Sequence, residues 1–306
     1  MKATYRIPGI PLEASRFLAL FAGRLRDYWL LSKPRVTALV WLTTAGGMYL
    51  ASREMEVPLA LWAHTLIASW FVIASANAFN QVLERDTDAL MSRTRLRPLP
   101  DGRISPTEAG MIAILWGVLG VAELAWFVHP LTAGIGVLCI ALYAFAYTPL
   151  KRVSSWCTVV GAIPGAMPPL AGWTAVRGEV SAIAWVLFGV QFLWQFPHLW
   201  SIAYLNREDY FRAGLRMMPG GPLGSEVLAR RIAVCALMLL PACLLLVPAT
   251  VQPVIYIIGC LLVSWAIIHP SLLFLRNKSR ATARAVMRGS LLFLPAWLIL
   301  VVTLMK

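Results

Sequence analysis

Apolar runs long enough to cross a lipid bilayer dominate the chain. A helix needs about 20 mostly apolar residues to span a hydrocarbon layer of roughly 30 Å. Prolines and polar loops separate each run from the next, as expected for connections at a membrane surface. The pattern predicts an all-α, polytopic membrane bundle of about nine transmembrane helices. The predicted spans are residues 36–52, 60–82, 107–127, 131–148, 156–175, 181–201, 231–249, 252–274 and 289–305.

The overall composition excludes a water-soluble fold. Of the 306 residues, 59% are apolar and only 13% are charged, whereas a soluble domain carries about 25% charged residues. Such a chain cannot cover a globular surface in water, and it is far too apolar to be disordered. The five cysteines all fall inside apolar runs without a CxxC pair, which favours small buried apolar side chains over metal ligands or disulfides.

The excess of positive charge predicts the orientation of the bundle. The chain has 27 Lys and Arg against 14 Asp and Glu, a net charge of +13. Such an excess can indicate nucleic-acid binding, but these cations lie in loops between apolar runs, where they determine membrane topology. With the N-terminus in the cytoplasm, 24 of the 27 lie inside, and only Arg53, Arg177 and Lys306 lie outside. We therefore expect a multi-pass protein of the plasma (inner) membrane, with its C-terminus outside and no nucleic-acid partner.

Two parts of unequal size are expected. Residues 1–32 form a cytoplasmic N-terminal arm, partly amphipathic, whose segment 10–31 is predicted to lie at the membrane surface. Residues 33–306 form one intramembrane domain. Its long polar loops, 84–106 and 202–229, are both predicted to be cytoplasmic. Because function concentrates in long, polar loops, we expect the chemistry at the cytoplasmic mouth of the bundle.

Oxygen-bearing side chains with helical spacing close the second predicted span. Asn80, Glu84 and Asp88 are four residues apart, so a helix places them along one face. Neighbouring carboxylates repel each other unless a cation neutralises them. Oxygen donors suit Mg²⁺, which commonly bridges one or two carboxylates to substrate phosphates. The alternative is a solvated helix end, in which Arg85 pairs with the acids.

Basic residues follow the acidic ones on the same side of the membrane. Arg93, Arg95 and Arg97 lie directly downstream, and Lys151 and Arg152 end the fourth span. Guanidinium groups match phosphate oxygens in a bidentate way, so these cations are candidates for binding a diphosphate. The alternative is ordinary positive charge that fixes topology.

The fifth and sixth spans carry further polar or helix-breaking residues. The fifth run contains three prolines and three glycines, which predict an interrupted helix beside a cavity. The sixth run ends with Trp194, Gln195 and His198, and a second acidic patch, Glu208 and Asp209, follows it. The residues of the fifth run are Gly161, Pro164, Gly165, Pro168, Pro169 and Gly172.

Together these motifs resemble the UbiA-type intramembrane prenyltransferases, and within that family the branch that farnesylates heme. The resemblance extends from about Lys33 to the C-terminus. Glu84 stands where the family usually has aspartate, and Glu208 and Asp209 replace the usual second acidic motif. The matching residues are Asn80, Glu84, Asp88, Met91, Arg93, Thr94, Arg97, Pro98, Leu99, Tyr147, Lys151, Arg152, Gly165, Pro168, Pro169, Gly172, Trp173, Trp194–His198, Asp209, Tyr210, Ala213, Gly214, Met218 and Pro219.

The resemblance implies a reaction and a set of roles. Farnesyl diphosphate would alkylate the vinyl group of heme b, and water would then add, giving heme O and diphosphate. It implies Mg²⁺ on Asn80, Glu84 and Asp88, with Glu208 and Asp209 as further metal ligands. The diphosphate would contact Arg93, Arg97, Tyr147, Lys151 and Arg152, and heme would contact Trp194, Gln195 and His198. Asn80, Glu84, Asp88, Lys151 and Arg152 would be catalytic.

Several alternatives remain open. His198 is a candidate iron ligand, propionate partner or proton partner, although a histidine at an inner helix end more often has a structural hydrogen-bonding role. The same machinery also suits prenyl transfer to a quinone precursor or a chlorophyll-like ring. A cation-coupled transporter or a non-catalytic heme-handling protein is the alternative of a different class. A heme A-forming enzyme or a terminal oxidase is a partner that follows from the resemblance alone.

Overall fold

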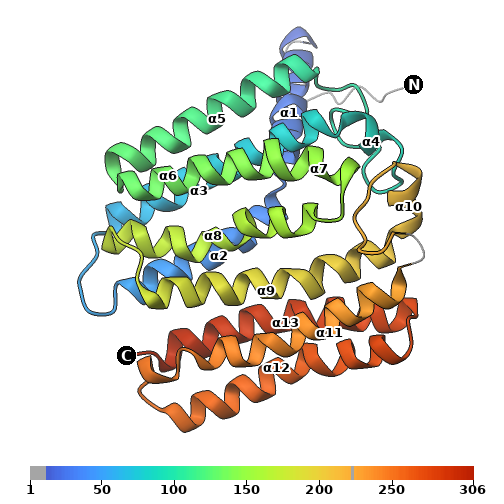
Figure 1. The fold of residues 1–306 in the computed structure, drawn as a ribbon. Coiled ribbons are helices and arrows are strands. Elements are labelled where there is room, and N and C mark those ends of the chain that lie inside the picture. The colour runs from blue at the N-terminus through green and yellow to red at the C-terminus, as the bar shows by residue number, and fades with distance from the viewer. Residues whose placement is uncertain (1–11, 222–223) are drawn as a thin grey trace.

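Long helices lying side by side build the molecule (Figure 1). The computed structural model describes residues 12–221 and 224–306, so the first part of the predicted N-terminal arm lies outside the described residues. The long helices are α1 (Leu12–Leu31), α2 (Pro34–Ala51), α3 (Leu59–Leu83), α5 (Pro106–Phe127), α6 (Pro130–Ile140), α8 (Cys157–Arg177), α9 (Ala182–Leu205), α11 (Ser225–Leu244), α12 (Pro253–Arg276) and α13 (Arg280–Leu304). The short helices are α4 (Arg85–Ala89), α7 (Thr148–Val153) and α10 (Arg207–Arg212), with a 3₁₀ turn at Val247–Ala249.

The all-α membrane bundle is confirmed, with one difference in the number of spans. Among the described residues, eight helices are long and apolar enough to cross a membrane. The first predicted run forms α2, which is not one of them, mainly because Pro34 and Arg35 lower the mean hydropathy of its 18 residues; these residues also include three threonines and two glycines. The threonines and glycines are buried against the rest of the bundle. α6 and α7 form one continuous span, Pro130–Val153, through a π-helical segment at Ala141–Tyr147.

Helix α8 corrects the expectation of an interrupted fifth span, because it runs unbroken through all three of its prolines. Pro169 has no N–H, so the carbonyl of Gly165, four residues earlier, lacks its usual helical donor. The side chain of Gln191 on α9 supplies one instead, with Nε2 2.9 Å from that carbonyl oxygen. The helix therefore continues because a neighbouring helix satisfies a carbonyl group that the proline leaves free.

Glycines allow α2 and α8 to pack closely. A Cβ at Gly172 would lie 2.0 Å from the carbonyl oxygen of Thr44, and a Cβ at Gly47 would lie 2.1 Å from that of Pro169. Both obstacles are backbone atoms, which cannot rotate away. Small residues at these contacts let two membrane helices approach backbone to backbone.

We expect Gly172→Ala to lower the free energy of unfolding by about 1–3 kcal/mol or more, because the added methyl group forces α2 and α8 apart. Thermal unfolding of the detergent-purified protein measures the effect. Gly134→Ala on α6 is the matched control, since a Cβ there meets nothing within 4 Å. Equal melting temperatures for the two variants would contradict close packing of α2 and α8.

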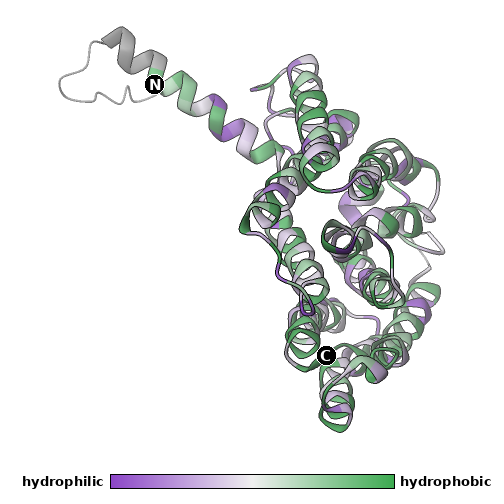
Figure 2. Ribbon diagram, turned by 90° about the vertical axis from the view of Figure 1, so that its left-hand side faces the viewer, coloured by the Kyte–Doolittle hydropathy of each residue, from purple (hydrophilic) through white to green (hydrophobic). Residues whose placement is uncertain are grey.

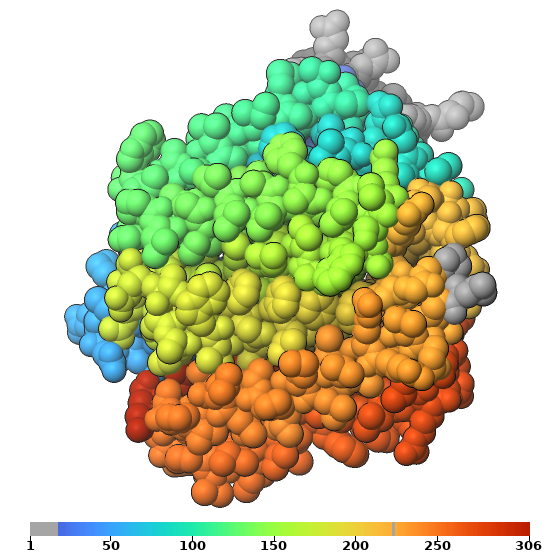
Figure 3. Space-filling model, viewed as in Figure 1, coloured from blue at the N-terminus to red at the C-terminus, as the bar shows by residue number. Residues whose placement is uncertain are grey.

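The short helices and the C-terminus mark opposite ends of the bundle. The short helices α4 and α10 lie at one end, and the C-terminus lies at the other (Figure 1). At the C-terminal end Arg53 donates to the carbonyl of Val302 at 2.6 Å. Viewed along the helices, α1 projects from the side of the bundle (Figure 2). The outer face in Figure 3 runs from α5 to α12, and α5 exposes apolar side chains such as Met111 and Trp126 on the surface.

Candidate active site

A cavity of about 570 Å³ leads into the bundle from the end that carries α4. Its walls come from α2, α3, α6, α8 and α9, and they are mainly apolar, with Leu39, Val72 and Ile135 among them. The polar residues Asn80 and Asp88 lie in the same lining. The cavity therefore has a charged part, called here the head region, around Asn80, Glu84, Asp88 and Lys151, and a larger part with apolar walls. Such a cavity suits a ligand with a polar head and a hydrocarbon tail.

The three residues predicted as a helical stripe do meet in this cavity, although the helix is not continuous. α3 ends at Leu83, Glu84 takes a non-helical conformation (φ −100°, ψ 7°), and α4 restarts at Arg85. Asn80, Glu84 and Asp88 nevertheless all line the cavity, because the break is only one residue long. The spacing of four predicted that the three residues face the same region, but not the break between α3 and α4.

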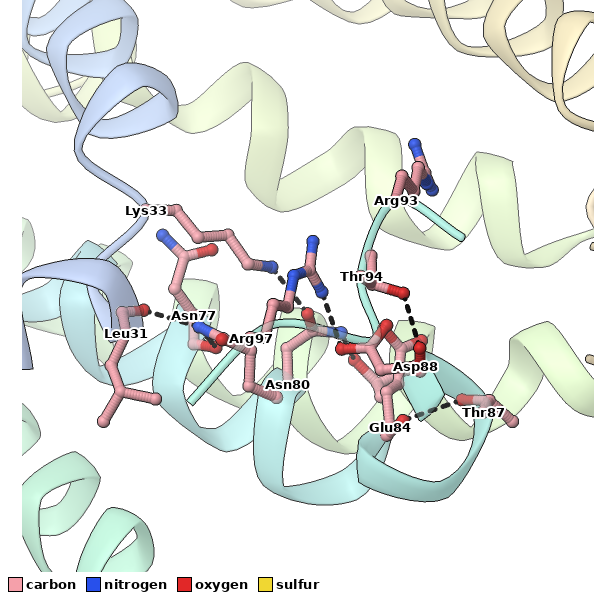
Figure 4. Close-up of polar contacts among 12 residues, drawn as sticks. Leu31, Lys33, Asn77, Asn80, Glu84, Thr87, Asp88, Arg93, Thr94 and Arg97 are labelled. Carbon is pink, nitrogen blue, oxygen red and sulfur yellow. Dashed lines mark hydrogen bonds and ion pairs between the residues drawn. The ribbon is translucent and has the colours of Figure 1, made fainter. Parts of the chain in front are cut away.

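Each carboxylate of the head region already has a cation partner. Lys151 Nζ lies 2.7 Å from Glu84 Oε1, and Arg97 Nη1 lies 2.7 Å from Asp88 Oδ2 (Figure 4). The side chain of Asp88 is only 1% exposed and that of Glu84 8%, so both carboxylates are screened from water. Burial alone would raise the pKa of Glu84, but Lys151 and Lys33 outweigh it and hold the pKa below its usual range.

Lys33 is a site residue that sequence reasoning missed. Its Nζ donates to Asn80 Oδ1 at 2.7 Å (Figure 4). Its backbone has φ +51°, a left-handed conformation that is rare for lysine. Asn77 and Gln81 hold the turn by donating to the two backbone carbonyls just before Lys33. Burial, together with the charges of neighbouring cations, lowers the pKa of Lys33 to about 7.

Lys33 lies just before the first predicted apolar run and next to Pro34. A cation at such a position usually indicates only membrane topology. A lysine at such a boundary normally extends into solvent, and nothing in the local sequence shows that this one turns into the bundle. Its role depends on contacts with α3, which is distant in the sequence.

Aromatic residues complete the head region. Lys151 Nζ lies 4.2 Å from the centre of the Tyr147 ring, and Arg93 Nη2 donates to the hydroxyl of Tyr210 at 2.6 Å. All four of these residues line the cavity. Tyr147 ends the π-helical segment, a deviation from α-helical geometry that occurs frequently at functional sites. Two cations and two aromatic rings thus border the region beside Glu84.

Three predicted site residues are not brought into the cavity. Arg152 is exposed and donates to the carbonyl of Leu83 at 3.2 Å. Asp209 accepts from Ser92 at 2.7 Å and pairs with Arg212, and the side chain of Glu208 is 77% exposed. Ser92 and Arg212 lower the pKa of Asp209, with the Ser92 hydrogen bond as the larger cause. Neither residue of the second acidic patch therefore lines the cavity together with Glu84 and Asp88.

The three predicted heme contacts lie on one cavity-facing side of α9. Trp194, Gln195 and His198 all line the cavity. Gln195 Nε2 donates to the carbonyl of Ala162 at 2.9 Å, and a Cβ at Gly165 would lie 2.1 Å from Gln195 Oε1. Gly165 therefore makes room for the amide of Gln195. A second histidine, His64 on α3, does not line the cavity. Its Nδ1 lies 2.7 Å from Glu123 Oε1 on α5.

The donor set of the head region fits a magnesium ion shared with a phosphate group. Within the described ranges, no group of three or more His, Cys, Asp or Glu side chains is arranged to hold a metal alone. The cavity instead offers two carboxylates and one amide oxygen. Glu84 Oε1 is buried, and its contact with Lys151 lacks the alignment of a hydrogen bond. Magnesium typically takes few protein oxygens and completes its coordination with water and substrate phosphates.

Comparison with known proteins identifies the family. The model of the UbiA prenyltransferase family matches residues 39–294. The chain belongs to this family. A relative from Gloeobacter violaceus named protoheme IX farnesyltransferase is 39% identical over 92% of this chain and 92% of its own length. Another relative of that name, from Anaeromyxobacter dehalogenans, is 44% identical over 73% of this chain and 75% of its own.

Solved structures support the same fold for this member of the UbiA prenyltransferase family. A digeranylgeranylglyceryl phosphate synthase aligns with a TM-score of 0.74 at 17% identity, over 92% of this chain and 98% of that one. A UbiA homologue from Archaeoglobus fulgidus, solved with GPP and Mg²⁺ bound, aligns with a TM-score of 0.61 at 17% identity, over 90% and 99%. The family predicted from the sequence motifs is confirmed.

Proposed function

We propose that this protein transfers a farnesyl group from farnesyl diphosphate to the vinyl group of heme b, with addition of water, giving heme O and diphosphate. The observation that carries the proposal is the cavity, whose buried acidic and basic head leads into an apolar body. The high identity to relatives named protoheme IX farnesyltransferase specifies the acceptor. Prenyl transfer to another acceptor by the same machinery is the competing hypothesis.

In this proposal the head of the cavity binds the diphosphate. Asn80, Glu84 and Asp88 would hold Mg²⁺, which neutralises the oxygens of the leaving group when bound. Lys151 and Arg97 are already beside the two carboxylates, at 2.7 Å each. Their positive charge stabilises the negative charge that grows on the diphosphate as its bond to carbon breaks.

Lys33, Arg93 and Tyr147 are proposed to complete the diphosphate site. Lys33 Nζ is held by Asn80, and Arg93 by the hydroxyl of Tyr210. Both cations are fixed before any substrate arrives, which reduces the entropy lost on binding. We do not assign Arg152, Glu208 or Asp209 a direct contact with the substrate, because none of them lines the cavity.

Heme b is proposed to bind beside α9. Trp194, Gln195 and His198 form the polar and aromatic part of that wall. We propose that the head region faces the cytoplasm across the inner membrane, an orientation that the charge asymmetry of the loops favours. Hand-over of heme O to a heme A-forming enzyme or a terminal oxidase remains a proposal that follows from the family alone.

Removal of magnesium is expected to abolish product formation, because the diphosphate would then meet Glu84 and Asp88 without neutralisation. The assay uses purified protein in lipid, with farnesyl diphosphate and heme b, and mass spectrometry of the extracted heme. EDTA should stop the reaction and added Mg²⁺ should restore it. Formation of heme O at an unchanged rate in EDTA would contradict the metal site.

The same assay tests the acceptor. A prenylated product with a quinone precursor, but none with heme b, would favour the competing hypothesis.

A further inference from the structure

Ser290 on α13 holds two side chains of α9 that line the cavity. Its backbone carbonyl accepts a hydrogen bond from Trp194 Nε1 at 2.6 Å, and its hydroxyl oxygen lies 2.8 Å from His198 Nδ1. The rings of Trp194 and His198 stack, with centroids 4.9 Å apart and an angle of 13° between their planes. One serine thus fixes the orientation of the imidazole.

The hydrogen bonds of Ser290 also determine the tautomer of His198. The Ser290 hydroxyl donates to the carbonyl of Met287 at 2.7 Å. A hydroxyl has only one hydrogen, so toward His198 it acts as an acceptor and Nδ1 carries the proton. The other nitrogen of a neutral imidazole, Nε2, then has a free lone pair. Within the part of the chain that the structure describes, no protein group is bonded to Nε2.

His198 lines the same cavity as the head region. Gln195, one helical turn away, donates to the carbonyl of Ala162 at 2.9 Å. Gly161, which precedes Ala162 on α8, packs against the ring of Tyr147, because a Cβ at Gly161 would lie 2.5 Å from that ring. This layer of contacts joins α9 to the head region, where the reacting carbon of a bound prenyl diphosphate must lie.

Resting on the function proposed above, we propose that His198 is the base that takes a proton from the water molecule completing the reaction. Ser290 is then the positioning residue that keeps Nε2 available. A neutral imidazole whose Nε2 lone pair has no protein partner can accept a proton from a water molecule as that water attacks the carbocation. The role of Ser290 is the one that a third group plays for many catalytic histidines, fixing tautomer and orientation.

The electrons and protons of this step balance. The carbon–oxygen electron pair leaves with diphosphate, and the vinyl π electrons form the new carbon–carbon bond. Positive charge then rests on the carbon attached to the porphyrin ring, where a water lone pair forms the new carbon–oxygen bond. His198 Nε2 takes one proton of that water and later releases it to solvent or to the departing diphosphate. No oxidant or reductant is needed.

The proposal predicts a change in product as well as in rate. Without a base for water, the carbocation loses a proton from the neighbouring carbon and gives an alkene that is one water lighter than heme O. We expect His198→Gln to lower the hydroxylated-to-alkene ratio on the order of 100-fold. Ser290→Ala should lower the hydroxylated-to-alkene ratio less than His198→Gln does. Ser290→Thr keeps the hydroxyl group and should therefore give the same ratio as the unsubstituted protein.

The experiment uses the full chain in lipid nanodiscs with farnesyl diphosphate, heme b and Mg²⁺, and quantifies both farnesylated hemes by mass spectrometry. Ser271→Ala is the matched control: Ser271 is also buried, and it donates to the carbonyl of Ile267 at 2.6 Å on α12, away from the cavity lining. It should leave the product ratio unchanged.

An unchanged ratio in His198→Gln overturns the proposal. If the absorption spectrum of bound heme b also shows loss of an axial ligand, His198 binds iron instead. If His198→Gln makes neither product, the Ser290 variants decide, and equal ratios in Ser290→Ala and the unsubstituted protein overturn the assignment. A failure of the proposed function is distinguishable, because the unsubstituted protein would then form neither farnesylated heme.

Discussion

Asp88→Asn is expected to lower kcat/KM for farnesyl diphosphate by on the order of 100-fold. The asparagine keeps an oxygen for Arg97 but removes the negative charge that a metal ion requires. Because Asp88 is only 1% exposed, no nearby water can replace the lost carboxylate. The rate of heme O formation at several concentrations of Mg²⁺ measures the effect.

The control for this substitution is Asp86→Asn, two residues away on α4. The side chain of Asp86 is 78% exposed and pairs with its neighbour Arg85, so its loss should leave kcat/KM within about twofold, as for an ordinary exposed pair. Equal rates for Asp88→Asn and the unsubstituted protein would refute a metal site at Asp88.

Lys151→Met should be the most destabilising single change in the head region. It leaves the carboxylate of Glu84 buried without its partner, at a cost of about 3–5 kcal/mol. Lys151 and Glu84 are 9% and 8% exposed, so water cannot take over the role of the ammonium group. Thermal unfolding in detergent should show the loss directly.

The double variant separates stability from activity. Glu84→Gln combined with Lys151→Met removes both charges, so the melting temperature should recover most of what Lys151→Met lost. Activity should remain absent, because the cation and the carboxylate proposed to hold the diphosphate and its metal are both missing. Recovery of activity together with stability would show that the pair serves only to hold α3 and α7 together.

Local spacing predicted the parts of the site that lie close together in sequence. Asn80, Glu84 and Asp88 recur every four residues, and that period survives the short break at Glu84. Apolar runs likewise predicted the helices, because a bilayer demands a minimum length. The prediction of an interrupted α8 was wrong, since the donor that satisfies Gly165 comes from Gln191 on another helix.

Residues whose role depends on distant contacts could not be ranked from sequence. Arg152 and Lys151 are adjacent in the chain, yet only Lys151 turns into the cavity. Lys33 reaches Asn80 through a left-handed turn that no local pattern requires. Ser290, on the last helix, carries no motif of its own, and its importance depends on bonds to two side chains of α9.

The cation partners of Glu84, Asp88 and Asn80 have a consequence for the cycle of turnover. Lys151, Arg97 and Lys33 place protein cations directly against the three oxygen-bearing side chains. On the proposed function, binding of a metal-bound diphosphate would be an exchange of partners, in which ammonium and guanidinium groups pass from protein oxygens to phosphate oxygens. On release of the product diphosphate, the same groups would return to their protein partners, so the protein itself would supply the charges that replace the departing anion.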